Sequence, residues 1–257
     1  LGPDRILVNV IAPGRIQTER IEELDQANAT KSGKPLDDVK ARKALSMAID
    51  REAITTAIYQ GAYTPATSII PPVVPGYRED VCGDICQHNP EEAKKLWDDN
   101  NGPDEVILWF NNDGGHEEWM EALSNQLRKT LGVTTKFESL AFEEYLTLQD
   151  EHKLTGPYRG AWVFDYPSPQ NYLEPIFSCD GSSQEFGYED HGCEEASDLI
   201  KEANATEDLD AAIELYHQAE DLILEDMPGT PTWFGVTNAG YSENVDNVIV
   251  DMTLVLE

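Results

Sequence analysis

A carboxylate follows a short apolar run in the second half of the chain. Residues Ala161–Phe164 are apolar and long enough for a buried strand, and Asp165 comes directly after them. Pro167 and Pro169 prevent further regular strand pairing, so the chain must leave a sheet at this point. An aspartate at a strand end is well placed to meet a ligand, but it could equally cap a helix over Gln170–Phe177. The local sequence leaves both interpretations open.

Aromatic side chains gather near the ends of the predicted strands. These residues are Trp109, Phe110, Trp162, Phe164, Tyr166 and Tyr172. We expect Phe110 and Phe164 to lie in the core. A tryptophan beside a carboxylate suits an amphipathic ligand with an ammonium group, because the ring covers the ligand body while the acid pairs with its charge. Trp162 and Asp165 are therefore the first candidate binding pair.

The sequence lacks the common catalytic motifs. It contains no Gly-x-Ser-x-Gly, no Gly-x-x-x-x-Gly-Lys and no His-Glu-x-x-His. Gly114-Gly115 resembles an anion-binding turn only superficially, and each of the five histidines is expected at the surface. With 49 acidic residues, chance pairs of carboxylates are common. We predict no enzyme activity, no cofactor and no metal, and keep a secreted hydrolase with paired carboxylates as the alternative.

Four cysteines occur as two near pairs. Three pairings are possible, and the simplest joins Cys82 to Cys86 and Cys179 to Cys193. The second bridge would close a loop of about 15 residues, a stabilisation of about 3 kcal/mol in the chain-entropy model. A zinc site at Cys82, Cys86 and His88 is the alternative, although a second Cys/His cluster is missing. Paired cysteines favour export.

Composition excludes some partners. The 257 residues allow one large or two modest domains. The formal net charge is −31, which argues against nucleic acid because phosphate binding needs clustered Lys and Arg. No window approaches the 18 uncharged apolar residues of a membrane span. The chain begins at Leu1 without a start methionine or signal peptide, and we expect a piece of a longer chain.

Strand and helix patterns alternate along the chain, which predicts an α/β lobe. The predicted strands cover residues 1–12, 105–110, 133–140, 158–164, 232–236 and 248–256. The predicted helices cover 37–59, a segment that begins with Asn89 as its cap, 117–131, 142–149, 194–203 and 209–225. The proline-rich stretch 64–77 is expected to be an extended ordered loop.

Several motifs resemble one known family, in order and over about residues 34–236. They are Lys34–Ile54, Ile70-Pro-Pro, Asn89–Leu96, Gln126–Val133, Gly160–Leu173, Leu215–Glu220 and Asp226-Met-Pro. Together they resemble the family 5 extracellular solute-binding proteins, the oligopeptide and dipeptide receptors of bacterial ABC importers. The resemblance implies a two-lobed α/β clamshell of the periplasmic-binding-protein type II arrangement, with a mixed sheet flanked by helices. It also implies a lead-in segment at 1–36, a C-terminal ligand-binding lobe at 37–232 and a return segment at 233–257.

The resemblance also implies roles for particular residues. The family's Trp-x-x-Asp pattern matches Trp162 and Asp165, so Asp165 would hold a peptide α-ammonium group and Trp162 would line a side-chain pocket. Cys179 and Cys193 match a disulfide of the dipeptide-binding subgroup. That subgroup places a carboxylate-pairing arginine where this chain has Asn111, which favours a longer peptide or a neutral ligand. Tyr166, Trp109 and Asn111 complete the predicted ligand-binding set.

The predicted function is the substrate-binding component of an ABC importer. We expect a monomer, periplasmic or lipid-anchored outside the cytoplasmic membrane, that captures short peptides by clamshell closure and delivers them to the permease. The alternatives are a receptor of the same family for an oligosaccharide, a nickel complex or haem, and a surface interaction module that no longer serves transport.

Overall fold

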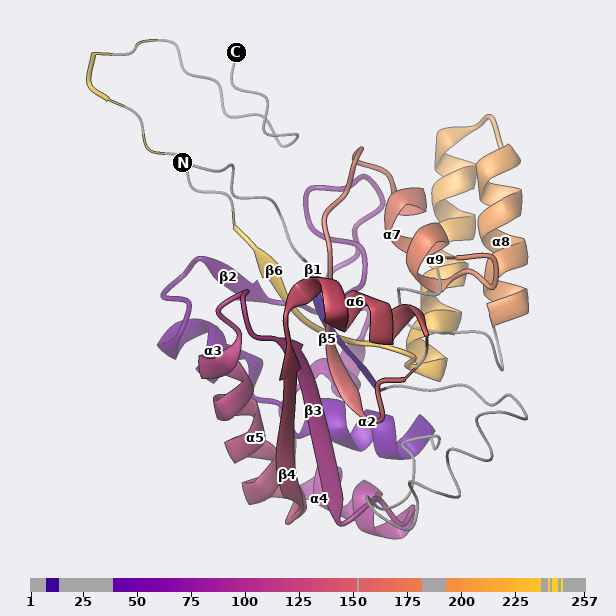
Figure 1. Ribbon diagram of the computed structural model, residues 1–257. Coiled ribbons are helices and arrows are strands. Elements are labelled where there is room, and N and C mark those ends of the chain that lie inside the picture. Colours follow the sequence, from indigo (N-terminus) through magenta and orange to yellow (C-terminus); the bar gives the residue numbers. More distant parts are fainter. Residues whose placement is uncertain are drawn as a thin grey trace.

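The computed structural model is a mixed six-stranded sheet with helices on both faces (Figure 1). The structure describes residues 8–13, 39–151, 153–181 and 193–236, together with 240, 242–244 and 246. The strands are β1 (Val8–Pro13), β2 (Tyr63–Pro65), β3 (Glu105–Asn111), β4 (Thr134–Leu140), β5 (Pro157–Trp162) and β6 (Thr230–Gly235). The helices are α2 (Val39–Met47), α3 (Arg51–Ala57), the short 3-10 helix η1 (Gly83–Cys86), α4 (Pro90–Asp99), α5 (Glu117–Leu131), α6 (Phe142–Asp150), α7 (Pro169–Phe177), α8 (Cys193–Ala205) and α9 (Leu209–Asp226).

The sheet combines a parallel half with an antiparallel half. The strand order is β2-β6-β1-β5-β3-β4. β3 runs parallel to both β4 and β5, whereas β1 is antiparallel to β5 and β6, and β2 is antiparallel to β6. The predicted α/β lobe with a mixed sheet and flanking helices is therefore confirmed.

One face of the sheet is covered by the helices from the first half of the chain. Alternate residues of β3, beginning with Val106, point into a core formed with α2, α3, α4 and α5. Trp233 of β6 belongs to the same core and is fully buried. Successive side chains of a strand point to opposite faces, so the next residue, Phe234, lies in the core on the other side.

The second face is covered by α6, α7, α8, α9 and the proline-rich loop. Tyr158 of β5, Tyr145 of α6 and Tyr172 of α7 belong to this core. The loop is held by Glu220 of α9, which accepts hydrogen bonds from the backbone N–H groups of Ile69 (3.0 Å) and Ile70 (3.1 Å). The loop is ordered as predicted, and its short strand β2 lies at the edge of the sheet, where proline is tolerated.

The single helix predicted over residues 37–59 is wrong, because the segment forms two helices. Asp50 breaks it by capping α3, and its side chain accepts a hydrogen bond from the backbone N–H of Ala53 at 2.9 Å. Gln126 of α5 accepts from the backbone N–H of Asp50 at 2.8 Å, which holds the break in place. The apolar stripe continues across the break, and for that reason it suggested one helix. The predicted cap at residue 37 lies outside the described residues.

Most other predicted elements are confirmed within a few residues. α5 has the predicted bounds and ends at Gly132, which adopts the left-handed conformation (φ 78°) that favours glycine. Asn89 caps α4 as predicted, accepting from the backbone N–H of Glu92 at 3.2 Å. β5 ends at Trp162, two residues earlier than expected. The strand predicted at 248–256 lies outside the described residues.

Both predicted disulfides form. Cys82 is bonded to Cys86 across η1, and Cys179 is bonded to Cys193 at the start of α8. The zinc alternative is therefore wrong, since its two thiolates are consumed by a bridge. Within the described ranges no three His, Cys, Asp or Glu side chains are arranged to hold a metal ion. In the same part of the chain, every helix is too short or too polar to cross a membrane.

Candidate functional site

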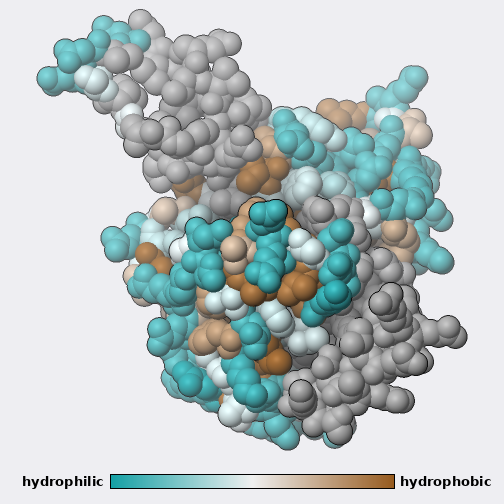
Figure 2. Space-filling model, viewed as in Figure 1, coloured by the Kyte–Doolittle hydropathy of each residue, from teal (hydrophilic) through white to brown (hydrophobic). Residues whose placement is uncertain are grey.

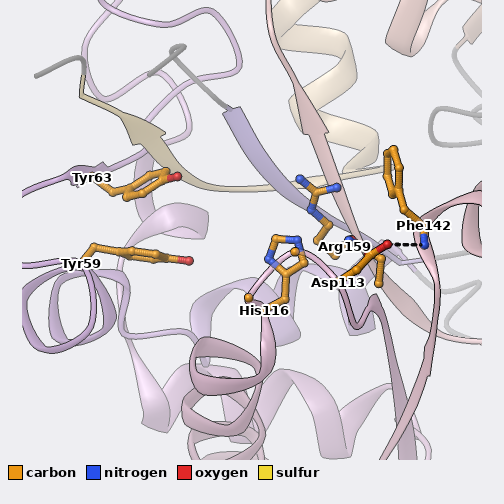
Figure 3. Close-up of a pocket in the computed structure, with 9 residues that line it drawn as sticks. Tyr59, Tyr63, Asp113, His116, Phe142 and Arg159 are labelled. Atoms are coloured by element: carbon orange, nitrogen blue, oxygen red, sulfur yellow. Dashed lines mark hydrogen bonds between the residues drawn. The ribbon is translucent and has the colours of Figure 1, made fainter. Parts of the chain in front are cut away.

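A pocket of about 420 Å³ opens where β3 ends and α5 begins (Figure 3). The residues that line it are Tyr59, Tyr63, Asn111, Asp113, Gly114, Gly115, His116, Phe142 and Arg159. Ligands of open α/β sheets bind outside the carboxyl ends of parallel strands, and this pocket lies at such an end. Four separate parts of the chain meet there: the segment around β2, the β3–α5 turn, the start of α6 and the strand β5.

Arg159 of β5 is partly buried, and within the described chain no carboxylate lies at ion-pair distance from it. Its Nε is buried and finds no hydrogen-bond partner there either. Burial lowers the pKa of Arg159, but a guanidinium stays protonated in proteins. Withdrawing a cation from water without an anion beside it is unfavourable, so an anionic group of a ligand could serve as its partner.

His116 lies beside Arg159 at the N-terminus of α5. Its Nδ1 accepts a hydrogen bond from Nε1 of Trp119 at 3.1 Å. Burial lowers the pKa of His116 to about 4, and the charge of Arg159 acts in the same direction. The ring is therefore neutral at pH 7, and because Nδ1 accepts, the proton sits on Nε2. A Cβ at Gly114 would collide with Nε2 of His116 and Nδ2 of Asn111, so a larger residue there would displace these side chains.

Asn111 and Asp113 shape the turn between β3 and α5. Nδ2 of Asn111 donates to Oδ1 of Asp113 at 2.7 Å, and Oδ2 of Asp113 accepts from the backbone N–H of Phe142 at 3.1 Å. The bond from Asn111, followed by that from Phe142, lowers the pKa of the Asp113 carboxyl. Oδ1 of Asn111 is buried and has no partner among the described residues, which leaves an acceptor for an N–H group of a ligand.

Two tyrosines with rings in tilted contact form the opposite wall. The ring centroids of Tyr59 and Tyr63 are 4.2 Å apart, and Tyr59 packs on Trp233 at 5.4 Å. In Figure 3 both hydroxyl groups point towards the side of the pocket where His116 and Arg159 lie. Burial raises the pKa of Tyr59, so its hydroxyl remains protonated and can donate a hydrogen bond.

The structure places the predicted site residues in two groups. Asn111 lines the pocket described above. Trp162 and Asp165 lie together around the buried Asn171 of α7, whose Oδ1 accepts from Nε1 of Trp162 (3.2 Å) and from the backbone N–H of Asp165 (2.9 Å). Tyr166 is exposed beside them and donates from its hydroxyl to Oε1 of Gln170 at 3.3 Å.

Trp109 belongs to neither group. It packs against the core on the α7–α9 side, and its Nε1 is buried without a partner in the described part of the chain. The alternative that Asp165 caps the following helix is wrong, because Ser168 occupies the N-cap of α7 and accepts from the backbone N–H of Gln170. Asp165 is exposed to solvent, so it is free to meet a ligand.

The sequence did not single out Arg159, the two tyrosines or Asn171. His116, which was expected at the surface, is half-buried and lines the pocket. One signal was present: the Gly114-Gly115 turn before a helix. The turn indicates a site only together with Arg159 of β5, which lines the same pocket in the folded chain.

Comparison with known proteins identifies the family. Residues 20–184 match the sequence model described as bacterial extracellular solute-binding proteins, family 5 middle. The chain is 33% identical over 205 residues to a dipeptide-binding protein of Escherichia coli K12, covering 76% of this chain and 37% of that protein. It is 25% identical over 261 residues to the oligopeptide-binding protein OppA of Bacillus subtilis 168, covering 98% of this chain and 47% of OppA.

A solved structure shows the same fold. HbpA2 from Haemophilus parasuis superposes with a TM-score of 0.82 at 22% identity, over 98% of this chain and 47% of HbpA2. The chain thus spans less than half the length of these relatives. The matched family model covers more than half of the chain. The chain belongs to the family 5 bacterial extracellular solute-binding proteins.

Proposed function

We propose that the chain forms one ligand-binding lobe of a two-lobed receptor that captures short peptides outside the cytoplasm and passes them to an ABC permease. Two relatives are named as a dipeptide-binding and an oligopeptide-binding protein, which supports a peptide ligand. The predicted division into residues 1–36, 37–232 and 233–257 belongs to this proposal. Closure of the two lobes around the peptide follows from a higher affinity of the ligand for the closed state.

The observation that carries the proposal is Arg159, a partly buried cation whose Nε is buried and which pairs with no carboxylate in the described chain. The peptide carboxylate pairs with Arg159 and accepts a hydrogen bond from Nε2 of His116. Oδ1 of Asn111 accepts from a backbone N–H of the peptide. A charge-assisted pair in a site that excludes water is strong, and guanidinium matches the two oxygens of a carboxylate.

The opposite end of the peptide meets Asp165. Arg159 and Asp165 are six residues apart, and an extended chain rises about 3.3 Å per residue, so their Cα atoms are separated by at most about 20 Å. A peptide with its carboxylate at Arg159 and its ammonium at Asp165 therefore has at most about six residues. Trp162 and Tyr166 provide aromatic cover for its first side chains.

The test is calorimetric titration of the complete gene product with tetra-alanine. Arg159→Met removes the charge and keeps much of the side-chain volume, and we expect it to weaken binding by about 2–5 kcal/mol, as truncation of one partner of a buried charge pair does. A peptide with an amidated C-terminus should bind the unsubstituted protein weakly. The Arg159→Met variant should bind the amidated peptide and the free acid with equal affinity. Arg128→Met, which removes an exposed arginine of α5, is the matched control.

Asp165→Asn tests the pairing of Asp165 with the ammonium end of the peptide. It should weaken binding of the free peptide by a similar amount and have little effect on an N-acetylated one. Equal affinity in the Arg159 and Arg128 variants would remove Arg159 from the site. Binding that changes neither on amidation of the peptide C-terminus nor on acetylation of its N-terminus would favour the non-peptide alternatives of the family.

A further inference from the structure

The pocket around Arg159 is larger than a carboxylate requires. Its volume is about 420 Å³, whereas a water molecule occupies about 30 Å³ of liquid and a carboxylate is of comparable size. Most of the pocket must therefore receive another part of the ligand. The group nearest to a C-terminal carboxylate is the side chain of the residue that carries it.

The walls of the remaining space are aromatic. Tyr59 and Tyr63 pack against each other on one side with their rings tilted, and Phe142 lies on the other side in Figure 3, with Arg159 and His116 between them. Phe142 is 42% exposed, although its backbone is fixed by the hydrogen bond to Asp113. An exposed phenylalanine at the mouth of a pocket gains when a ligand covers it.

The tyrosine wall is rigid before any ligand binds. Tyr59 packs on Trp233, which is fully buried, and Trp233 packs edge-on against Trp119 at 5.1 Å. Trp119 in turn donates to His116, so the ring wall and the hydrogen-bond donor beside Arg159 belong to one continuous packed unit. Such preformed aromatic surfaces favour ligand rings in edge-to-face or offset-stacked contact.

We infer that the pocket selects an anionic ligand end that bears an aromatic ring, which in a peptide means a C-terminal phenylalanine, tyrosine or tryptophan. The ring lies between the tyrosine pair and Phe142 while the carboxylate meets Arg159. This inference rests on the proposed function and extends it, since the proposal requires only a peptide carboxylate. Failure of this inference and failure of the proposed function give different results in the experiment below.

The experiment compares Ala-Ala-Ala-Phe with Ala-Ala-Ala-Ala and Ala-Ala-Ala-Leu by calorimetry on the complete gene product. We expect the phenylalanine peptide to bind roughly 10- to 100-fold more tightly than tetra-alanine, and more tightly than the leucine peptide. Amidation of the phenylalanine peptide should remove most of its affinity. Equal affinity for the three peptides would overturn the inference and leave the peptide receptor intact.

A matched pair of variants locates the selectivity. Phe142→Ala should reduce the phenylalanine-to-alanine ratio several-fold, because it removes one wall of the pocket. Phe137→Ala is the control, since Phe137 of β4 is 44% exposed and does not line the pocket. An unchanged ratio in Phe142→Ala would overturn the inference even if the protein prefers aromatic ends. Absence of binding by every tetrapeptide would contradict the proposed function itself.

Discussion

At the scale of single residues, the pocket keeps two basic groups in different charge states. Arg159 stays charged although it is partly buried, whereas desolvation keeps His116 neutral at pH 7. A charged imidazole beside Arg159 would add repulsion to the cost of desolvation. The neutral ring instead donates one hydrogen bond from Nε2, and its orientation is fixed by Trp119. This arrangement concentrates the positive charge of the pocket on one side chain.

His116 should make stability depend on pH. Its pKa falls from 6.5 to about 4 on folding, so between these values the unfolded chain binds the proton more readily. The contribution of His116 to folding is therefore complete above pH 6.5 and is lost as the pH falls to about 4. Urea titrations at pH 7.5 and pH 4.5 should show a smaller difference in the free energy of unfolding for His116→Gln than for the unsubstituted protein. Identical differences in both proteins would contradict the buried, neutral histidine.

At the scale of elements, one helix holds the proline-rich loop. Glu220 of α9 is fully buried and accepts from Ile69 and Ile70 through Oε1, while Oε2 accepts from Arg78 at 2.9 Å. Burial raises the pKa of Glu220, and the backbone and Arg78 hydrogen bonds oppose this rise. The proline-rich loop cannot form regular pairing, so these bonds replace the ladder that a strand would have provided.

Glu220→Gln should therefore destabilise the protein. The amide retains one acceptor oxygen but places an NH₂ group against donors, and we expect a loss of about 1–3 kcal/mol in the free energy of unfolding. Asp221→Asn is the matched control, because Asp221 contacts the same Arg78 at 2.6 Å but its side chain is 54% exposed. The control should cost at most about 1 kcal/mol. Chemical denaturation measures both, and equal losses would show that the backbone contacts of Glu220 do not anchor the loop.

At the scale of the whole molecule, charge is the dominant feature. The chain carries 49 acidic and 18 basic residues, and hydrophilic side chains cover much of the described surface in Figure 2. Mutual repulsion of surface carboxylates opposes the compact state, and the repulsion weakens when salt shortens the Debye length. Arg159 carries the positive charge among the residues that line its pocket, beside the carboxylate of Asp113, and it is the group there that would attract an anionic ligand end.

Salt should stabilise this protein. The Debye length falls from about 10 Å at 0.1 M to about 3 Å at 1 M, and we expect the thermal midpoint to rise over that range. Differential scanning calorimetry in NaCl and KCl provides the measurement, and the steepest rise should occur below about 0.5 M, where screening changes most. A midpoint that does not move between 0.1 M and 1 M would show that the carboxylates are too dispersed to repel each other.

Much of the fold followed from local signals in the sequence. The bounds of α5 come from its apolar period and Gly132, and the cap of α4 comes from Asn89 and Pro90. The family motifs and the cysteine spacing are also local patterns, and the structure confirms the lobe and both disulfides. The local pattern gave a wrong prediction at Asp50, where a helix cap divides one predicted helix into two although the apolar stripe continues across it.

The sequence by itself determined the family, the layered α/β lobe and the cluster at Trp162 and Asp165, because each depends on residues close together in the chain. Only the tertiary structure decided that Arg159 and His116 share a pocket with Tyr59. These residues come from segments far apart in the chain, and Arg159 looks in sequence like any alternating strand residue. The role of Arg159 in the pocket depends on which strands lie beside β5 and on the burial of its Nε without a hydrogen-bond partner in the described chain.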